Sequence, residues 1–419
     1  MTPKILIVAP NASSRFGGEA FLPLKYFQIL HRRGHPVRLI AHARNRADLT
    51  EFLTPDAAEA VDYIEDTRAH RAAWKSRRLL PGRLGDALAG TLLGRVNEHF
   101  QSKVIRSRVA AGEAELIHQP IPVSPLAPSS LYGFGVPVVI GPMNGGMTYP
   151  EGYEDLESAA DRRMVALARG AARMLNRLVP GKRRAAALLV SNDRTARALP
   201  CPDHPHIITL VENGVDFSTW TRPPERAPRS LDAPFRLVFM GRLVGWKAVE
   251  ITLDALARAR AQGIDARLEI LGDGDSRAGL EARADALGLT DAVTFAGFRP
   301  QAECAARLAA ADALILNSVW ECGGAVVLEA MAMGLPVIAS DWGGPADYLD
   351  PGCGILVPPV PRDRFADRLA DAIGRLARDP AHAAALGAAG AAKVRAQYDW
   401  EKKVDRMLEI YDQAMEPRQ

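Results

Sequence analysis

Short apolar runs alternate along the chain with longer segments in which apolar residues recur every three or four positions. The short runs are typical of buried strands in parallel sheets, and the longer segments are typical of helices that cover both faces of such sheets. The strand-like runs of the first half are KILIVAP, PVRLIAHA, AELIHQP, VPVVIGP, ALLVSN and HIITLVENGVD. Those of the second half are FRLVFMG, ARLEILG, VTFAGF, ALILNS and PVIAS. The alternation predicts an α/β protein with two doubly wound parallel sheets.

Length and composition agree with two domains. A chain of 419 residues with 48% hydrophobic content is too long for one ordinary core. The segment 218–234, STWTRPPERAPRSLDAP, has no apolar period and is rich in Pro, Arg and Ser, so we expect it to be a linker. The first domain is therefore predicted at 1–217, and the second begins at 235. Ligands of two such domains bind in the cleft between them, at the carboxyl ends of the strands.

Charge and cysteine content narrow the function classes. A net charge of +3 gives no support for a general role in nucleic-acid binding. The four cysteines include no C-x-x-C pair, which predicts reduced thiols and a cytoplasmic protein, without a disulfide framework or a zinc site. The apolar run at the N-terminus is too short for a signal sequence or a membrane span and is expected to be the first strand.

The stretch SVWECGGAVVLEAMAMGLPVIAS carries the strongest chemical signal. It predicts a strand, a turn at Gly323 and Gly324, and a helix over 325–333. Free N–H groups at a helix N-terminus bind anions, and glycine lets a phosphate approach the backbone. Glu321 precedes the turn, and Glu329 lies two helical turns further on. If both were merely solvated, Glu329 would not be expected inside the apolar run AVVLEAMAMG, so we expect both carboxylates to accept sugar hydroxyls.

Two other loops offer groups for a phosphate. Arg242 and Lys247 lie five residues apart in MGRLVGWK and could clamp a diphosphate, although a solvated basic loop is the alternative. Gly17 and Gly18 follow the first strand without the third glycine of a dinucleotide-binding motif, which disfavours NAD but allows close approach of a phosphate or sugar.

Two signals have competing interpretations. His118 ends the strand AELIH and is a candidate to point into the cleft, whereas a lone histidine is more often structural. The run GDGD, residues 272–275, contains the Asp-x-Asp pattern of some metal sites. Its place between a strand and a helix favours a turn with an N-cap carboxylate, so no metal is expected.

The region 162–184 predicts an amphipathic basic helix. Arg169, Arg173 and Arg177 share one stripe, and Met164, Leu167, Ala171, Met174 and Leu178 share the other face. Together with the arginine-rich 68–83, this helix could dock on anionic lipid headgroups. The alternative is a helix packed on the core with a solvated basic face.

These motifs, in the order GRLVGWK, LGDGDSR, FAGF, ECGGAVVLEAMAMGLPVIAS and CGILVPP, resemble the donor domain of the retaining glycosyltransferase family 4, with its E-x7-E signature at Glu321 and Glu329. The first half matches more loosely, through Gly17-Gly18, HQP at 118–120 and ENGVD at 212–216. The resemblance implies a GT-B fold, in which two Rossmann-like domains face a central cleft. It also implies a donor domain at 235–397 and a final helix, 398–419, that crosses back to the first domain.

The resemblance implies a role for each matching residue. Arg242 and Lys247 would bind the diphosphate and help the nucleotide leave, Glu321 would hold hydroxyls of the transferred sugar, Glu329 would hold the ribose, and His118 would lie near the reacting centre. The remaining donor-binding positions are Gly17, Gly18, Gly272, Gly297, Phe298, Arg299, Cys322, Gly323, Gly324, Ala325 and Val326. The base would lie near 297–299.

The implied function is a retaining glycosyltransferase that uses a nucleotide sugar, a UDP-sugar by preference, with no cofactor and no metal. Its acceptor would be a lipid, a lipid-linked glycan or a polysaccharide at the cytoplasmic face of a membrane, with peripheral contact to anionic lipid and no nucleic-acid partner. Two alternatives remain open at this point. One is a nucleotide-sugar isomerase or epimerase of the same fold, and the other is a non-catalytic sugar-binding protein.

Overall fold

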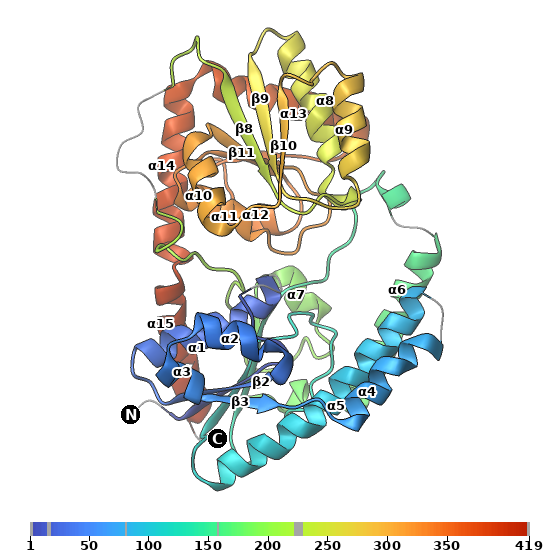
Figure 1. Ribbon diagram of the computed structural model, residues 1–419, viewed down its shortest axis with the longest axis vertical. Coiled ribbons are helices and arrows are strands. Elements are labelled where there is room, and N and C mark those ends of the chain that lie inside the picture. Colours follow the sequence, from blue (N-terminus) through green and yellow to red (C-terminus); the bar gives the residue numbers. More distant parts are fainter. Residues whose placement is uncertain (1–2, 15–17, 80–81, 157–158, 222–228, 417–419) are drawn as a thin grey trace. The chain divides into compact units, whose positions relative to one another are not determined.

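A computed structural model describes residues 3–14, 18–79, 82–156, 159–221 and 229–416. The chain divides into two compact units, each made from separate stretches of sequence (Figure 1). The first unit comprises Met1–Gly146, Val165–Glu212 and Glu401–Gln419, and the second comprises Met147–Met164 and Asn213–Trp400.

The first unit is built on a parallel sheet with the order β3-β2-β1-β4-β5-β6-β7. Its strands are β1 (Ile5–Val8), β2 (Val37–His42), β3 (Val61–Ile64), β4 (Leu116–Gln119), β5 (Val138–Met143), β6 (Ala187–Val190) and β7 (Ile207–Thr209). All but β3 match runs that the sequence predicted. The central strands are buried along their whole length, as expected for a sheet that is covered on both faces.

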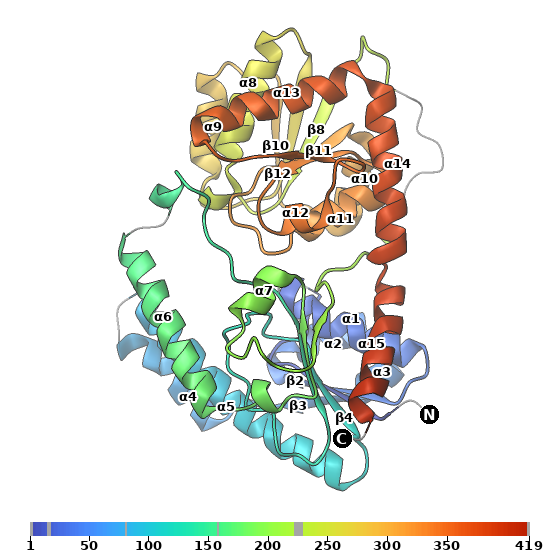
Figure 2. The ribbon, with the colours of Figure 1, turned by 180° about the vertical axis from the view of Figure 1, so that it is seen from behind.

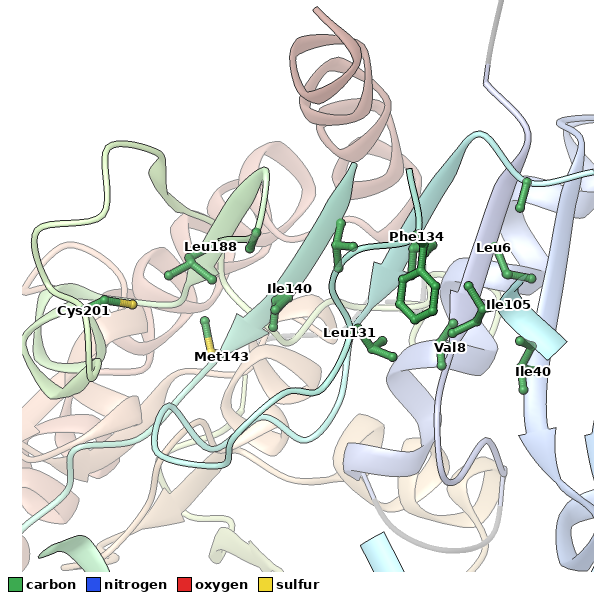
Figure 3. Close-up of a cluster of buried hydrophobic side chains, with 14 of the residues drawn as sticks. Leu6, Val8, Ile40, Ile105, Leu131, Phe134, Ile140, Met143, Leu188 and Cys201 are labelled. Carbon is green, nitrogen blue, oxygen red and sulfur yellow. The ribbon is translucent and has the colours of Figure 1, made fainter. Parts of the chain in front are cut away.

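The core of the first unit lies between this sheet and its helices. Figure 3 shows Leu6 of β1, Ile40 of β2 and Ile140 of β5 with Ile105 of α5, all of them 0–2% exposed. The helices are α1 (Gly18–Arg32), α2 (Arg46–Phe52), α3 (Pro55–Glu59), α4 (Arg68–Lys75), α5 (Gly82–Ala110), α6 (Ala159–Leu178), whose residues from Val165 onward belong to this unit, α7 (Asp193–Ala198) and α15 (Trp400–Met415).

The second unit holds a parallel sheet with the order β10-β9-β8-β11-β12-β13. Its strands are β8 (Phe235–Met240), β9 (Ala266–Leu271), β10 (Val293–Gly297), β11 (Ala313–Leu316), β12 (Val337–Ser340) and β13 (Ile355–Val357). The order reverses beside β8, which is the switch point of a doubly wound fold. The prediction of two Rossmann-like domains is therefore confirmed.

Helices cover both faces of the second sheet (Figures 1 and 2). They are α8 (Val249–Ala261), α9 (Arg277–Ala286), α10 (Gln301–Ala310), α11 (Ala325–Ala332), α12 (Gly344–Tyr348), α13 (Phe365–Arg378) and α14 (Pro380–Gln397). α13 packs against α8 on one face, and α14 packs against α11 on the other. Loops follow the strands at their carboxyl ends.

The unit boundaries differ from those expected from sequence. Residues 147–164 were assigned to the first domain, but they lie in the second unit, where the Tyr153 hydroxyl donates to the Pro359 carbonyl after β13. At the other end of the chain, Glu401 and Asp405 of α15 both pair with Arg33, which directly follows α1, at 2.6 Å in each case, so α15 from Glu401 onward lies in the first unit. The described parts of the linker, 218–221 and 229–234, lie in the second unit, where Arg229 donates a hydrogen bond to the Ala377 carbonyl.

Candidate functional site

Two loops at the carboxyl edge of the second sheet are bonded together. The loop after β8 contains a short 3-10 helix, Gly245–Lys247, and then Ala248 in the left-handed region with φ 51°. That conformation is unfavourable for alanine. It is held by the fully buried Asn317 after β11, whose amide donates to the Ala248 carbonyl at 2.8 Å and accepts from the Thr252 hydroxyl at 2.5 Å. The position of Lys247 is therefore fixed relative to the loop after β11.

Lys247 and Glu321 form an ion pair across these two loops. Their side chains are only 14% and 17% exposed, so water screens the pair weakly. The backbone of Glu321 is held as well, because its carbonyl accepts the N–H of Gly344 at 2.7 Å. Two residues that the sequence assigned separately to diphosphate and sugar thus lie in direct contact.

Arg242 lies in the same loop as Lys247 but is exposed. Its guanidinium is 5.6 Å from the ring centre of Trp246. Within the described part of the chain it has no ion-pair partner. It is therefore available to a diphosphate, and the predicted clamp by Arg242 and Lys247 stays a prediction.

The Gly-Gly turn forms the N-terminus of α11, as predicted. Gly324 is the N-cap with φ 81°, a conformation that favours glycine, and a Cβ there would meet Cγ of Glu321 at 3.1 Å. The first-turn N–H groups of a helix have no partner inside the helix. The neighbouring positions predicted to line the donor, Cys322, Ala325 and Val326, are half-buried, and Gly323 is buried. This turn can hold an anion.

Glu329 lies on α11 in apolar surroundings. Burial raises the pKa of its carboxyl to about 7, although the residue keeps part of its surface exposed. No side chain in the described ranges bonds or pairs with this carboxylate. It is therefore placed as an acceptor for hydroxyls of a ligand, which fits the ribose role implied by the resemblance.

The loops after β9 and β10 border the same edge. Gly272 has φ 142° and packs so closely on the Gly241 carbonyl that a side chain would clash, and its N–H donates to the Gly297 carbonyl at 2.9 Å. Phe298 follows with 80% of its surface exposed, and the Arg299 side chain is 39% exposed. An exposed aromatic ring at the end of a parallel strand is a suitable platform for a nucleobase.

The expected N-cap carboxylate after β9 is not found. The N-cap of α9 is Ser276, whose side chain makes no capping bond. Asp273 instead accepts the N–H of Gly274 at 2.8 Å and pairs with Arg277 at 3.1 Å. The GDGD run is thus a turn, as predicted, but its carboxylates do not cap the helix because the chain enters α9 one residue later.

Sequence reasoning missed a segment at this edge, residues 147–156, which we call the strap. Tyr153 is fully buried, and its hydroxyl donates to the Pro359 carbonyl after β13 at 3.1 Å. Arg362 donates to the Gly152 carbonyl at 3.0 Å and pairs with Asp155 at 2.5 Å. These contacts join stretches about 200 residues apart in sequence, so no local sequence pattern predicts them.

The chain was then compared with known families. Residues 223–393 match the model for glycosyl transferases group 1. The matched range contains Arg242, Lys247, Glu321 and Glu329 and covers the donor half of the predicted GT-B fold.

Curated relatives match over about half of the chain. The chain is 31% identical over 238 residues to an alpha-D-kanosaminyltransferase of Streptomyces kanamyceticus, covering 55% of this chain and 61% of the relative. It is 35% identical over 236 residues to a D-inositol 3-phosphate glycosyltransferase of Mycobacterium avium, covering 54% and 55%. The chain thus spans roughly half to three fifths of the length of these relatives.

The fold is that of GT-B glycosyltransferases. A crystal structure of HepE from Anabaena, in complex with UDP and glucose, superposes with a TM-score of 0.63 at 18% identity. The superposition covers 98% of this chain and 99% of HepE, so the likeness includes both Rossmann-like units.

Outside the group 1 match, His118 does not have the predicted role at a reacting centre. It is 0% exposed, and both ring nitrogens have protein partners: Nε2 donates to the Gly141 carbonyl at 2.7 Å, and Nδ1 accepts from the Tyr411 hydroxyl at 2.7 Å. Burial lowers the pKa of His118 to about 4. The structural alternative is correct for this residue, because strand β4 directs the side chain under α15 and away from the surface.

The glycine pair of the first unit is only partly described. Gly17 lies outside the described residues. Gly18 is the first residue of α1 and is exposed, with open space where a Cβ would lie. The predicted approach of a phosphate or sugar at this pair stays a prediction.

The first unit also brings together one set of metal-ligand side chains. One ligand atom each of His42, Asp66 and His70 lie within 4.8 Å of one another. However, Nδ1 of His42 accepts the N–H of Arg44, and Nδ1 of His70 accepts the N–H of Thr67, both at 3.2 Å. A neutral imidazole whose Nδ1 accepts a hydrogen bond carries its proton on Nε2, which leaves no lone pair there for a metal. The donor set does not fit a metal without a change of tautomer.

The apolar face of α6 is exposed. Leu167, Met174 and Leu178 are 60–75% exposed, and Arg173 and Arg177 beside them are exposed as well. The alternative of a helix packed on the core is therefore wrong for these residues. No helix within the described ranges is both long and apolar enough to cross a bilayer.

Proposed function

We propose that this chain is a retaining, metal-independent glycosyltransferase that transfers a sugar from a nucleotide-sugar donor to a lipid, lipid-linked or polysaccharide acceptor. The observation that carries the proposal is the Lys247–Glu321 pair beside the N-terminus of α11. It sets a cation and the N-terminal end of a helix where a diphosphate would leave, and a carboxylate where sugar hydroxyls would bind. A UDP-sugar is the preferred donor, in line with the UDP and glucose bound to HepE.

The proposed chemistry relies on electrostatic stabilisation of the leaving group. Lys247, Arg242 and the α11 N-terminus would hold the diphosphate as its bond to the sugar breaks, and these charges would take the place of a metal. Glu321 is already ion-paired and is therefore a weak nucleophile, which favours retention without a covalent intermediate. The leaving phosphate would accept the acceptor proton on the same face of the sugar.

Burial of His118 also weighs against the isomerase alternative. That reaction needs an acid and a base on the sugar, and the sequence offered His118 and Glu321 for these roles. With His118 fully buried and both its nitrogens bonded, one of the two candidates is lost.

The proposal is tested by the release of free nucleotide from a panel of UDP-, GDP- and ADP-sugars with chelator present. We expect slow release from one donor, unaffected by chelator, and loss of that release in Glu321→Ala. Glu269→Ala is the matched control, because Glu269 on β9 also pairs with a basic side chain, that of Arg307 at 2.5 Å, but belongs to a strand and not to the edge loops. Neither release nor nucleotide binding with any donor would favour the non-catalytic sugar-binding alternative.

We further propose that α6 docks on anionic membrane at the cytoplasmic face, which would bring the enzyme to a lipid acceptor. Its exposed apolar residues lie beside Arg169, Arg173 and Arg177, and Trp74 of the arginine-rich α4 is 54% exposed. Each well-placed arginine contributes about 1 kcal/mol near such a surface.

The docking prediction is tested by sedimentation with anionic vesicles. We expect binding to fall at least tenfold when Arg169, Arg173 and Arg177 are changed to Glu, because three charges of about 1 kcal/mol each are reversed. The control makes the same charge change at exposed positions of the second unit, Arg258, Arg364 and Arg375. Equal partitioning of both variants and the wild type would refute membrane docking by α6.

A further inference from the structure

The strap places an aromatic side chain against the residue that precedes Glu321. The ring of Tyr149 packs on that of Trp320, with centroids 4.6 Å apart and planes at 39°. Trp320 is the residue directly before Glu321. Both rings are half-buried, so each retains exposed surface.

Several contacts hold Tyr149 in this position. On one side, the indole N–H of Trp342 donates to the Thr148 carbonyl at 2.9 Å, and Met147 packs closely against Gly343 in the loop after β12. On the other side, buried Tyr153 anchors the strap to the loop after β13. The ring of Tyr149 is therefore fixed between two anchored points and needs little ordering when a ligand binds.

We propose that Tyr149 and Trp320 form an aromatic wall of the subsite that takes the transferred sugar. This inference rests on the proposed function, in which Glu321 accepts hydroxyls of that sugar. A pyranose presents hydroxyl groups at its rim and C–H groups on its faces. The rim suits a carboxylate, and the C–H groups suit the negative face of an aromatic ring. Tyr149 and Trp320 supply that second surface, and Trp320 directly precedes Glu321 in the loop after β11.

The wall has a specific consequence for binding. It would contact the sugar and not the nucleotide. The proposed function puts the diphosphate at Lys247, and the resemblance puts the ribose at Glu329 and the base near 297–299. Loss of the ring should therefore weaken binding of the sugar nucleotide and leave binding of the free nucleotide unchanged. If Tyr149 had a purely structural role, its loss would weaken binding of both ligands together.

The test measures Kd for UDP and for UDP-glucose, and the rate of UDP-glucose hydrolysis, in the full chain. For Tyr149→Ala we expect UDP-glucose binding and kcat/KM to fall roughly tenfold, the effect of losing one favourable aromatic contact, with a Kd for UDP within about twofold of wild type. Tyr149→Phe keeps the ring and should behave as wild type. Trp320→Leu should show the same separation between the two ligands.

The control is Tyr132→Ala, which removes a half-buried tyrosine of the first unit that contacts Arg184. It should leave both affinities unchanged. Equal losses for UDP and UDP-glucose in Tyr149→Ala, or no loss for either, would overturn the aromatic wall. If wild-type protein binds neither UDP nor UDP-glucose, the proposed UDP-sugar donor itself fails, and that outcome is distinct from failure of the wall.

Discussion

Lys247→Ala is expected to reduce turnover by about 10²–10³-fold, the typical effect of removing one group that stabilises charge in the transition state. Lys247 is the cation that pairs with Glu321 and would meet the leaving diphosphate. Stability should fall by only about 2 kcal/mol, because Glu321 loses a partner at a site that is not fully closed to water. Turnover is measured with the donor that the nucleotide-release panel identifies, and stability is measured by thermal unfolding of the same preparation. The two measurements separate the effect on activity from the effect on stability.

The matched control for this prediction is Lys393→Ala. Lys393 also belongs to the second unit and pairs with a carboxylate, Asp350 at 2.6 Å, but it lies on α14. It should keep normal turnover. Near-normal turnover in a folded Lys247→Ala variant would refute the diphosphate clamp. Equal losses of turnover in both variants would indicate a general loss of structure.

His118→Ala is expected to destabilise the protein by about 3 kcal/mol and to leave the turnover of the folded molecules near normal. The substitution removes two hydrogen bonds at a fully buried position and leaves the Tyr411 hydroxyl and the Gly141 carbonyl without their partner. Chemical denaturation gives the stability, and turnover is assayed well below the unfolding temperature. A large loss of turnover without loss of stability would restore the catalytic role that the sequence suggested.

The same histidine predicts a pH dependence of stability. Burial lowers its pKa from 6.5 to about 4, and the nearby charge of Lys403 acts in the same direction. The unfolded chain therefore binds a proton at higher pH than the folded chain does. Stability from His118 is fully present above pH 6.5 and is lost as the pH falls toward 4, with a total of about 3 kcal/mol.

The pH prediction is checked by comparing wild type with His118→Gln. The difference in the free energy of unfolding should be larger at pH 7.5 than at pH 4.5, and it should narrow by about 2–3 kcal/mol over this range. Other buried groups titrate equally in both proteins and cancel in the comparison. A constant difference would show that His118 is not neutral and buried in solution.

Much of the fold was predictable because parallel strands that are covered on both faces are almost entirely apolar. Such runs located β1, β8 and β11 and the turn at Gly324. The missed strands β3 and β13 lie at sheet edges, where the strand is short and partly exposed. In β3, VDYI places Asp62 and Tyr63 in the middle of the strand, so no continuous apolar run marks it.

The candidate site was predictable only where its residues are close in sequence. The stretch that contains Glu321, the two glycines and Glu329 predicts a strand, a turn and a helix from neighbouring residues alone. His118 was misjudged because its partner Tyr411 comes from the far end of the chain. The strap was missed for the same reason. Tyr149 contacts Trp320, and more than half of the second unit's sequence lies between these two residues.

The order in which the chain enters and leaves its two units matters for protein engineering. It crosses between them at 146–147, 164–165, 212–213 and 400–401. A chimera that exchanges only 213–400 between two proteins of this fold would combine the loops of one parent with the strap of the other. The contacts of Tyr149 and Tyr153 would then join unmatched sequences. Segments 147–164 and 213–400 should be exchanged together, as a single module encoded in two pieces.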